Sequence, residues 1–168
     1  VLPTIINHGS DEQQRRWVAP TLRGEEIWCQ LFSEPGAGSD LASLTTKAVR
    51  DDQNGGWRIT GQKVWTTMAH IAQWGLLLAR TDPAAQPPHR GMSCFIVEKG
   101  APGLTVVKSI GKLGYKGVDT VELVFDGFPV PADNLVGGVE GRGFKHVMSG
   151  LETGRINIAA RAVGVAQA

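Results

Sequence analysis

The chain has 168 residues, of which 42% are hydrophobic, so it is the size of one domain and can bury a proper core. Lysine and arginine number 17 against 16 acidic residues, and no basic block interrupts the sequence, which argues against a nucleic-acid or anionic-membrane surface. The longest apolar stretches, such as GLLLA at 75–79, are far shorter than the ~20 residues of a membrane span. We therefore expect a soluble globular protein.

The first element expected is a short helix between Ser10 and Pro20. Ser10 followed by Gln13 is a helix-start signature, and two acidic residues occupy the first turn. The sequence opens without an initiator methionine or a secretory signal and ends inside a helical pattern. We therefore expect a piece of a longer chain.

From residue 27 to 128, short β-favouring runs alternate with Gly, Pro, Asn and Asp. Asn54-Gly55 supplies the positive-φ pair that a tight hairpin requires. The strand candidates lie at 27–33, 44–50, 56–60, 63–67, 74–80, 93–98, 104–110 and 119–125. Their number predicts a mainly β fold, a barrel or a sandwich.

The stretch 126–143 is rich in Gly and Pro and leads into a long helix that begins near Gly143. Arg155 falls on the apolar stripe of this helix, where a buried guanidinium would require a partner. The stripe consists of Phe144, Val147, Met148, Leu151, Ile158, Ala162 and Val165.

Two cysteines, Cys29 and Cys94, lie inside apolar strand-like segments without metal-ligand spacing. Buried reduced thiols are therefore expected, which indicates a reducing compartment. Four histidines, at 8, 70, 89 and 146, show neither ligand spacing nor a nucleophile partner, so metal and triad chemistry are disfavoured. His146 is expected to be solvated or interfacial.

The stretch SEPGAGSD, at 33–40, fails both the dinucleotide fingerprint and the P-loop pattern. Its glycines, Gly36 and Gly38, could still bring backbone N–H groups close to a ligand, and Ser39 adds a hydroxyl. Taken alone, a plain bend at the rim of a barrel is the simpler interpretation.

In QKVWTT, strand alternation predicts Lys63, Trp65 and Thr67 on one face and Val64 and Thr66 on the other. A stacking ring and a nearby hydroxyl could hold a planar heteroaromatic ligand. A tryptophan that fills the core is the competing interpretation.

Taken together, these segments closely resemble the acyl-CoA dehydrogenase family of flavoenzymes over nearly the whole chain. The matching motifs include FSEPGAGSD, WRITGQKVWTT, LGYKGVDTVELVFDGFPVPADNLVG and GRGFKHVMSGLETGRINIAARAVGVAQA. The resemblance implies the end of an N-terminal helical domain at 1–26, a β-barrel middle domain at 27–138 and the start of a C-terminal helical domain at 139–168.

The resemblance also implies FAD as the cofactor. Ser33 would hydrogen-bond the pyrimidine side of the isoalloxazine, Trp65 would pack against the ring, and Thr67 would reach toward N5. Ser39 would lie at the pyrophosphate and near the acyl-CoA. The implied flavin contacts are Gln30, Leu31, Phe32, Ser33, Gly38, Ser39, Trp65, Thr66 and Thr67.

The implied substrate contacts are Ser39, Glu152 and Arg155, the last two along the pantetheine arm. An ordinary helical ion pair between Glu152 and Arg155 is the competing interpretation, but the place of Arg155 on the apolar stripe favours a buried or pocket-facing role. The family's reaction is α,β-dehydrogenation of an acyl-CoA, with a carboxylate that removes the α-proton. Some relatives carry that carboxylate immediately before the arginine that Arg155 matches, where this chain has Gly154. No catalytic residue is therefore assigned, and the chain alone is expected to be inactive and to hold FAD weakly.

The resemblance further implies an electron-transferring flavoprotein as acceptor, a homotetramer, and a cytoplasmic or mitochondrial-matrix location. A non-catalytic partner subunit of the same fold and an acyl-CoA oxidase are the alternatives. Oxygen reactivity of the reduced flavin would separate the oxidase from the dehydrogenase.

Overall fold

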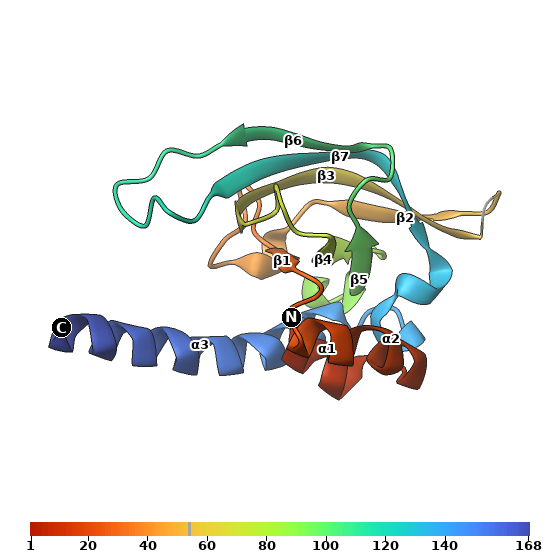
Figure 1. The fold of residues 1–168 in the computed structure, drawn as a ribbon. Helices are drawn as coiled ribbons and strands as arrows, with labels where there is room; N and C mark the ends of the chain where they lie inside the picture. The colour runs from red at the N-terminus through yellow and green to blue at the C-terminus, as the bar shows by residue number, and fades with distance from the viewer. Residues whose placement is uncertain (54) are drawn as a thin grey trace.

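The computed structural model describes residues 1–53 and 55–168 (Figure 1). The helices are α1 (Leu2–His8), α2 (Asp11–Leu22) and α3 (Gly143–Gln167). The strands are β1 (Trp28–Leu31), β2 (Lys47–Asp51), β3 (Gly56–Thr67), β4 (Trp74–Arg80), β5 (Met92–Glu98), β6 (Leu104–Ser109) and β7 (Thr120–Pro131). Short 3-10 turns are η1 (Leu41–Ser43), η2 (Pro88–Gly91), η3 (Ala132–Asn134) and η4 (Val136–Gly138).

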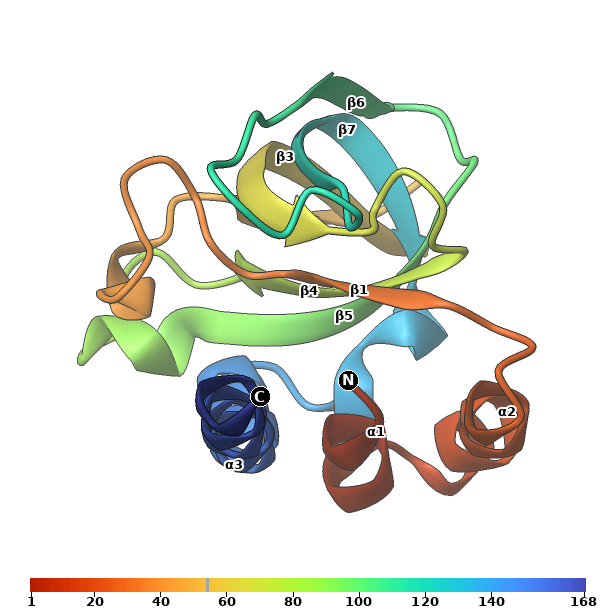
Figure 2. The same cartoon turned by 60° about the vertical axis from the view of Figure 1, so that its left-hand side comes forward.

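All seven strands belong to one mixed sheet that curls into a half-barrel, so the mainly β expectation is confirmed. The pairs β1–β4 and β2–β4 are parallel, whereas β2–β3, β3–β7, β6–β7 and β4–β5 are antiparallel. Figure 2 shows β1, β4 and β5 in one layer, with β3, β6 and β7 above it and the three helices below it.

Two apolar clusters occupy the two sides of the β4–β5 layer. One fills the inside of the curl, where Trp57, Phe95 and Phe128 are almost fully buried. The other lies between the layer and the helices and includes Ile5 and Trp17. Because β4 and β5 are covered on both faces, their sequences are continuous apolar runs rather than alternating ones.

The segments predicted as strands at 56–60 and 63–67 form a single strand, β3. The glycine between them, Gly61, marks a register shift against β7 rather than a break. Its φ is +156°, and a Cβ there would lie 2.4 Å from the Thr46 hydroxyl oxygen. The chain thus needs glycine at this position to pass Thr46 while the ladder continues.

The predicted helix start is confirmed, because Ser10 Oγ accepts from the Gln13 N–H at 3.2 Å and Gln13 Oε1 accepts from the Ser10 N–H at 3.0 Å. The helix also ends near Pro20 as predicted, although Pro20 itself lies inside α2, which continues to Leu22. A proline in a helix removes one backbone hydrogen bond and crowds the carbonyl four residues before it, which favours an end soon afterwards. Two further differences are α1, which was not expected, and β7, which runs to Pro131 and so enters the Gly- and Pro-rich stretch 126–143.

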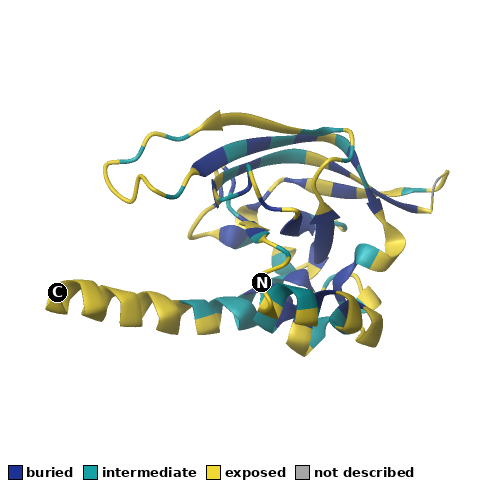
Figure 3. Cartoon of the chain, in the orientation of Figure 1, coloured by how far each residue is buried: buried dark blue, intermediate teal, exposed yellow. Residues whose placement is uncertain are grey.

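The long helix α3 begins at Gly143 as predicted, and its first turns pack on β5. Beyond Gly154 every residue is exposed, and Figure 3 shows this half of the helix projecting away from the sheet. The hairpin expected at Asn54-Gly55 fits the antiparallel pairing of β2 with β3, but Asn54 lies outside the described residues. Among the residues described, none of the helices is both long and apolar enough to cross a membrane.

Candidate functional site

A cleft of about 460 Å³ opens where the end of β1 meets the second half of β3. Its two walls are the segments Trp28–Ser33 and Val64–Met68, which are far apart in sequence. The lining residues are Val1, Trp28, Cys29, Gln30, Phe32, Ser33, Val64, Trp65, Thr67 and Met68. Five of the predicted flavin contacts, Gln30, Phe32, Ser33, Trp65 and Thr67, are therefore brought together in one cleft.

A backbone hydrogen bond joins the two walls, since the Val64 N–H donates to the Ser33 carbonyl oxygen at 2.9 Å. The next residue, Trp65, has φ +59° and leaves 62% of its surface exposed. A positive φ is a genuine outlier for a bulky residue. The large ring is thus held in the open by an unusual backbone conformation.

The alternation predicted for QKVWTT is wrong for Lys63, which does not share a face with Trp65. Lys63 pairs with Leu123 and Thr66 with Val121, so β3 has one residue more than β7 over this span. This β-bulge turns both Lys63 and Thr66 into the interior and leaves Trp65 exposed. A bulge cannot be read from a period-2 pattern.

Two other predicted flavin contacts, Leu31 and Thr66, have buried side chains, each 1% exposed. Neither lines the cleft, so their role as flavin contacts stays a prediction. The Thr66 hydroxyl has no hydrogen-bond partner within the described part of the chain.

The loop that follows the cleft wall holds Gly38 and Ser39, both of which are exposed. Its turn is closed by two backbone hydrogen bonds between Glu34 and Ala37, at 2.9 and 3.1 Å. Gly38 has a negative φ, and a Cβ built on it would meet nothing within 4 Å. Neither backbone conformation nor packing inside the chain therefore requires glycine at this position.

The predicted substrate contacts on α3, Glu152 and Arg155, lie outside the cleft and are exposed. Arg155 stands on the part of the helix that projects from the sheet, in the company of exposed Ile156 and Ile158. Their role stays a prediction.

A buried ion pair behind the cleft was missed by the sequence reasoning. Lys63 Nζ lies 2.9 Å from Glu34 Oε1, and the two side chains are 0% and 5% exposed. Burial lowers the pKa of Lys63 to about 8 against the opposing effect of Glu34. Burial alone would raise the pKa of Glu34, but Lys63 and hydrogen bonds from Thr45 and Thr46 hold it at about 2. Both groups are thus mostly charged at neutral pH.

Both cysteines are free and buried, as expected. Burial raises the pKa of Cys29, which lines the cleft, to about 12. The protonated thiol is a poor nucleophile. The cleft therefore offers no thiolate chemistry at neutral pH.

Of the two places expected for His146, the solvated one is wrong, because this residue is buried, 8% exposed, whereas the interfacial one fits its position between α1 and α3. Its ring stacks on that of His8, with 4.5 Å between centroids and 17° between planes. Burial, followed by the nearby charges of His8, Arg142 and Lys145, lowers the pKa of His146 to about 4. This stack lies at the contact of α1 with α3. The sequence did not predict α1, so this contact was not expected.

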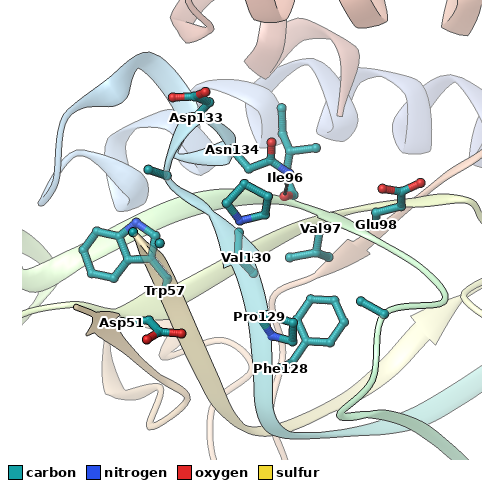
Figure 4. Close-up of a pocket in the computed structure, with 15 residues that line it drawn as sticks. Asp51, Trp57, Ile96, Val97, Glu98, Phe128, Pro129, Val130, Asp133 and Asn134 are labelled. Carbon is teal, nitrogen blue, oxygen red and sulfur yellow. Dashed lines mark hydrogen bonds between the residues drawn. The ribbon is translucent and has the colours of Figure 1, made fainter. Parts of the chain in front are cut away.

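A larger hollow of about 590 Å³ lies between the ends of β5 and β7. Figure 4 shows Trp57, Phe128 and Val130 along it, with Asp133 and Asn134 contributed by η3. None of the predicted site residues lines it. Within residues 1–53 and 55–168, no group of three or more His, Cys, Asp or Glu side chains could hold a metal ion.

A family model, two curated proteins and a solved structure that match this chain all carry the name of one enzyme family. A family model described as the acyl-CoA dehydrogenase middle domain matches residues 29–128. Acyl-CoA dehydrogenase FadE34 of Mycobacterium tuberculosis is 53% identical over 137 residues, 82% of this chain and 19% of that protein. The human mitochondrial short-chain specific acyl-CoA dehydrogenase is 40% identical, over 99% of this chain and 39% of that protein.

Among solved structures, butyryl-CoA dehydrogenase from Megasphaera elsdenii matches with a TM-score of 0.91 at 35% identity. The match covers 98% of this chain and 42% of that one. The chain therefore spans well under half the length of these relatives.

Proposed function

Because the chain belongs to the acyl-CoA dehydrogenase family, we propose that it supplies the flavin-binding and thioester-binding part of an FAD-dependent enzyme that converts an acyl-CoA to the 2-enoyl-CoA. The observation that carries the proposal is the convergence of Ser33, Trp65 and Thr67 on one open cleft. The segments 1–26, 27–138 and 139–168 would be the end of one helical domain, the middle domain and the start of another.

The residues of the cleft fit an isoalloxazine ring. Trp65 offers an exposed aromatic face, which suits stacking on a planar heterocycle. Thr67 is exposed beside it, and its hydroxyl can donate to or accept from the edge of the ring. Ser33 offers a hydroxyl from the opposite wall, while Gln30 and Phe32 complete that wall. Leu31 and Thr66, which are buried next to lining residues, would support the two walls from behind.

The loop at Gly38 and Ser39 fits a phosphate group. A glycine that the chain itself does not need leaves its N–H open to a ligand at close range, and the Ser39 hydroxyl is exposed next to it. In this proposal the loop holds the FAD pyrophosphate and reaches the acyl-CoA. Glu152 and Arg155 would contact the pantetheine arm.

The bound flavin would supply the redox chemistry, accepting the β-hydrogen as hydride. The chain's own part is to orient ring and thioester and to keep water from the reacting atoms. Among the described lining residues none is an acid or a histidine, so the base that takes the α-proton would come from outside this cleft. Electrons would pass on to an electron-transferring flavoprotein, and the enzyme would be a homotetramer of the cytoplasm or the mitochondrial matrix.

The same absence of an acid or a histidine from the described lining also fits a second candidate, a non-catalytic partner subunit that keeps the flavin-binding fold. Anaerobic titration separates the two. The full gene product is reconstituted with FAD and titrated with acyl-CoAs of different length and branching while the flavin absorption is recorded.

Bleaching of the oxidised band by one class of acyl-CoA would support the dehydrogenase and identify its substrate. Bound flavin that no thioester bleaches would favour the partner subunit. If no flavin binds, the roles given to Ser33, Trp65 and Thr67 are wrong.

A further inference from the structure

The ammonium of Lys63 is fully buried and has two acceptors on one short segment. Nζ donates to the Phe32 carbonyl oxygen and to Glu34 Oε1, each at 2.9 Å. Burying a charge is costly, and an apolar side chain of the same size often serves packing as well or better. The pair therefore calls for an explanation beyond filling space.

Glu34 is held firmly on its other side. Its Oε2 accepts from the N–H and hydroxyl of Thr45 at 2.7 and 2.8 Å, and its Oε1 accepts from the Thr46 N–H at 2.9 Å. The carboxylate is thus held in place by three hydrogen bonds besides the one from Lys63. Lys63 is thereby anchored to a rigid acceptor rather than to a mobile one.

The acceptors of Lys63 flank the residue proposed to contact the flavin. Phe32 and Glu34 are the neighbours of Ser33, whose own carbonyl accepts from the Val64 N–H at 2.9 Å. Lys63 and Val64, two consecutive residues of β3, therefore hydrogen-bond to the three consecutive residues of the segment Phe32–Glu34. The residue that follows them, Trp65, is the exposed ring of the cleft.

The β-bulge makes this arrangement depend on register. One extra residue between Lys63 and Thr66 sends Lys63 inward and leaves Trp65 outside. A slip by one residue would turn the side chains to the other face. Such a slip would take the Lys63 ammonium away from Phe32 and Glu34, leaving the Glu34 carboxylate buried without its cation.

We propose that Lys63 is a positioning residue, which locks the β3 bulge onto the Phe32–Glu34 segment and so sets the two walls between which the flavin ring binds. The inference rests on the proposed function, because it concerns flavin binding. Glu34 is the anchor of this contact, and the Phe32 carbonyl is the point at which the anchor is tied to the cleft wall.

The test compares Lys63→Met and Glu34→Gln in the full gene product. Lys63→Met removes the donor to Phe32, whereas Glu34→Gln leaves that donor in place but strips a buried ammonium of its counter-ion. If Lys63 positions the cleft, Lys63→Met weakens FAD binding by about tenfold or more, the effect of losing roughly one charged hydrogen bond. Glu34→Gln then lowers the unfolding midpoint more but weakens FAD binding less.

Binding is measured by fluorescence titration of folded apoprotein, together with the absorption envelope of the bound flavin and hydrogen exchange of the Val64 amide. Lys63→Met is expected to alter the envelope and speed the exchange. Val130→Ala, at the far end of the curl and 2% exposed in the wild type, is the matched control that lowers stability without touching either wall. If Lys63→Met does not fold, Lys63→Gln, with a shorter neutral donor, replaces it under the same expectation.

A Lys63 variant whose FAD affinity, flavin spectrum and Val64 exchange match those of Val130→Ala would overturn the inference and leave Lys63 a structural residue. Wild-type protein that binds no FAD contradicts the proposed function instead.

Discussion

Trp65 combines a strained backbone with an exposed ring. Its φ of +59° is one that large L-residues rarely adopt, and 62% of its surface is open to solvent. Such strain costs about 1–2 kcal/mol and tends to persist at ligand sites, where the surrounding structure imposes it. Stability alone would therefore favour a different residue at this position.

We expect Trp65→Asn to leave the free energy of unfolding unchanged or to raise it by about 1 kcal/mol, because asparagine tolerates a positive φ. The same change should weaken FAD binding by at least about tenfold through loss of the stacking face. Trp65→Phe, which keeps a ring and the strain, is the matched control and should retain most of the affinity. Urea unfolding and flavin fluorescence give the two values, and a Trp65→Asn protein that binds FAD normally would contradict the prediction.

His146 makes the free energy of unfolding depend on pH in the mildly acidic range. Its pKa is about 4 in the folded chain against 6.5 when unfolded, so the unfolded state binds more protons as pH falls through that window. Stability contributed by the neutral ring is therefore complete above pH 6.5 and is lost toward pH 4, by up to about 3 kcal/mol.

We expect His146→Phe, which keeps a ring against His8, to flatten the pH dependence of the unfolding free energy in this range. Urea unfolding at several pH values measures the slope. An unchanged slope in the variant would assign the pH dependence to other groups.

At the scale of elements, sequence periodicity predicted the class of fold and most strands but failed where one residue changed the register. Gly61 and the Val64–Trp65 bulge both interrupt the alternation of β3, and each does so for a contact distant in sequence: Thr46 in one case, Glu34 in the other. A period-2 pattern along one strand does not predict contacts with residues that are distant in sequence. The resemblance of whole motifs still selected Ser33, Trp65 and Thr67, which the structure brings to one cleft, while it missed the buried charges behind them.

The start of α3 shows a second contact that periodicity cannot predict. Gly143 lies so close to β5 that a Cβ would come within 2.4 to 2.6 Å of backbone atoms of Ser93 and Cys94. Helix propensity alone would favour alanine there. The close approach of α3 to β5 leaves no room for the alanine side chain, so glycine is required there.

We therefore expect Gly143→Ala to destabilise the chain by about 1–3 kcal/mol, since backbone atoms would have to move. Gly154→Ala on the same helix, where a Cβ meets nothing within 4 Å, is the matched control. That change should stabilise the chain by up to about 1 kcal/mol. Thermal or urea unfolding of both variants measures the difference, and equal effects would show that the contact with β5 is not tight in solution.

At the scale of the whole molecule, the proposed binding surface borders both apolar clusters, since Cys29 belongs to one cluster, Phe32 to the other, and both line the cleft. The side chains of Ser33, Trp65 and Thr67, which are proposed to contact the flavin, belong to neither cluster. Changes at these three residues can therefore abolish flavin retention without removing core contacts. The chain provides both walls behind the ring, but Trp65 remains mostly uncovered. Beyond Gly154 the residues of α3 are all exposed, although Arg161 Nη1 donates to the Tyr115 hydroxyl at 3.1 Å.

We expect residues 1–168, expressed alone, to fold cooperatively yet to release FAD during gel filtration and to show no acyl-CoA dehydrogenation. A ring stacked on one exposed tryptophan gains about 1.4 kcal/mol from that contact, far too little by itself for retention at micromolar protein. The full gene product, carried through the same column, is the control for the cofactor itself. A ratio of flavin to protein near one in the short chain would mean that this cleft and its loop suffice for binding, and turnover by the short chain would mean that the α-proton is taken by a group within these residues.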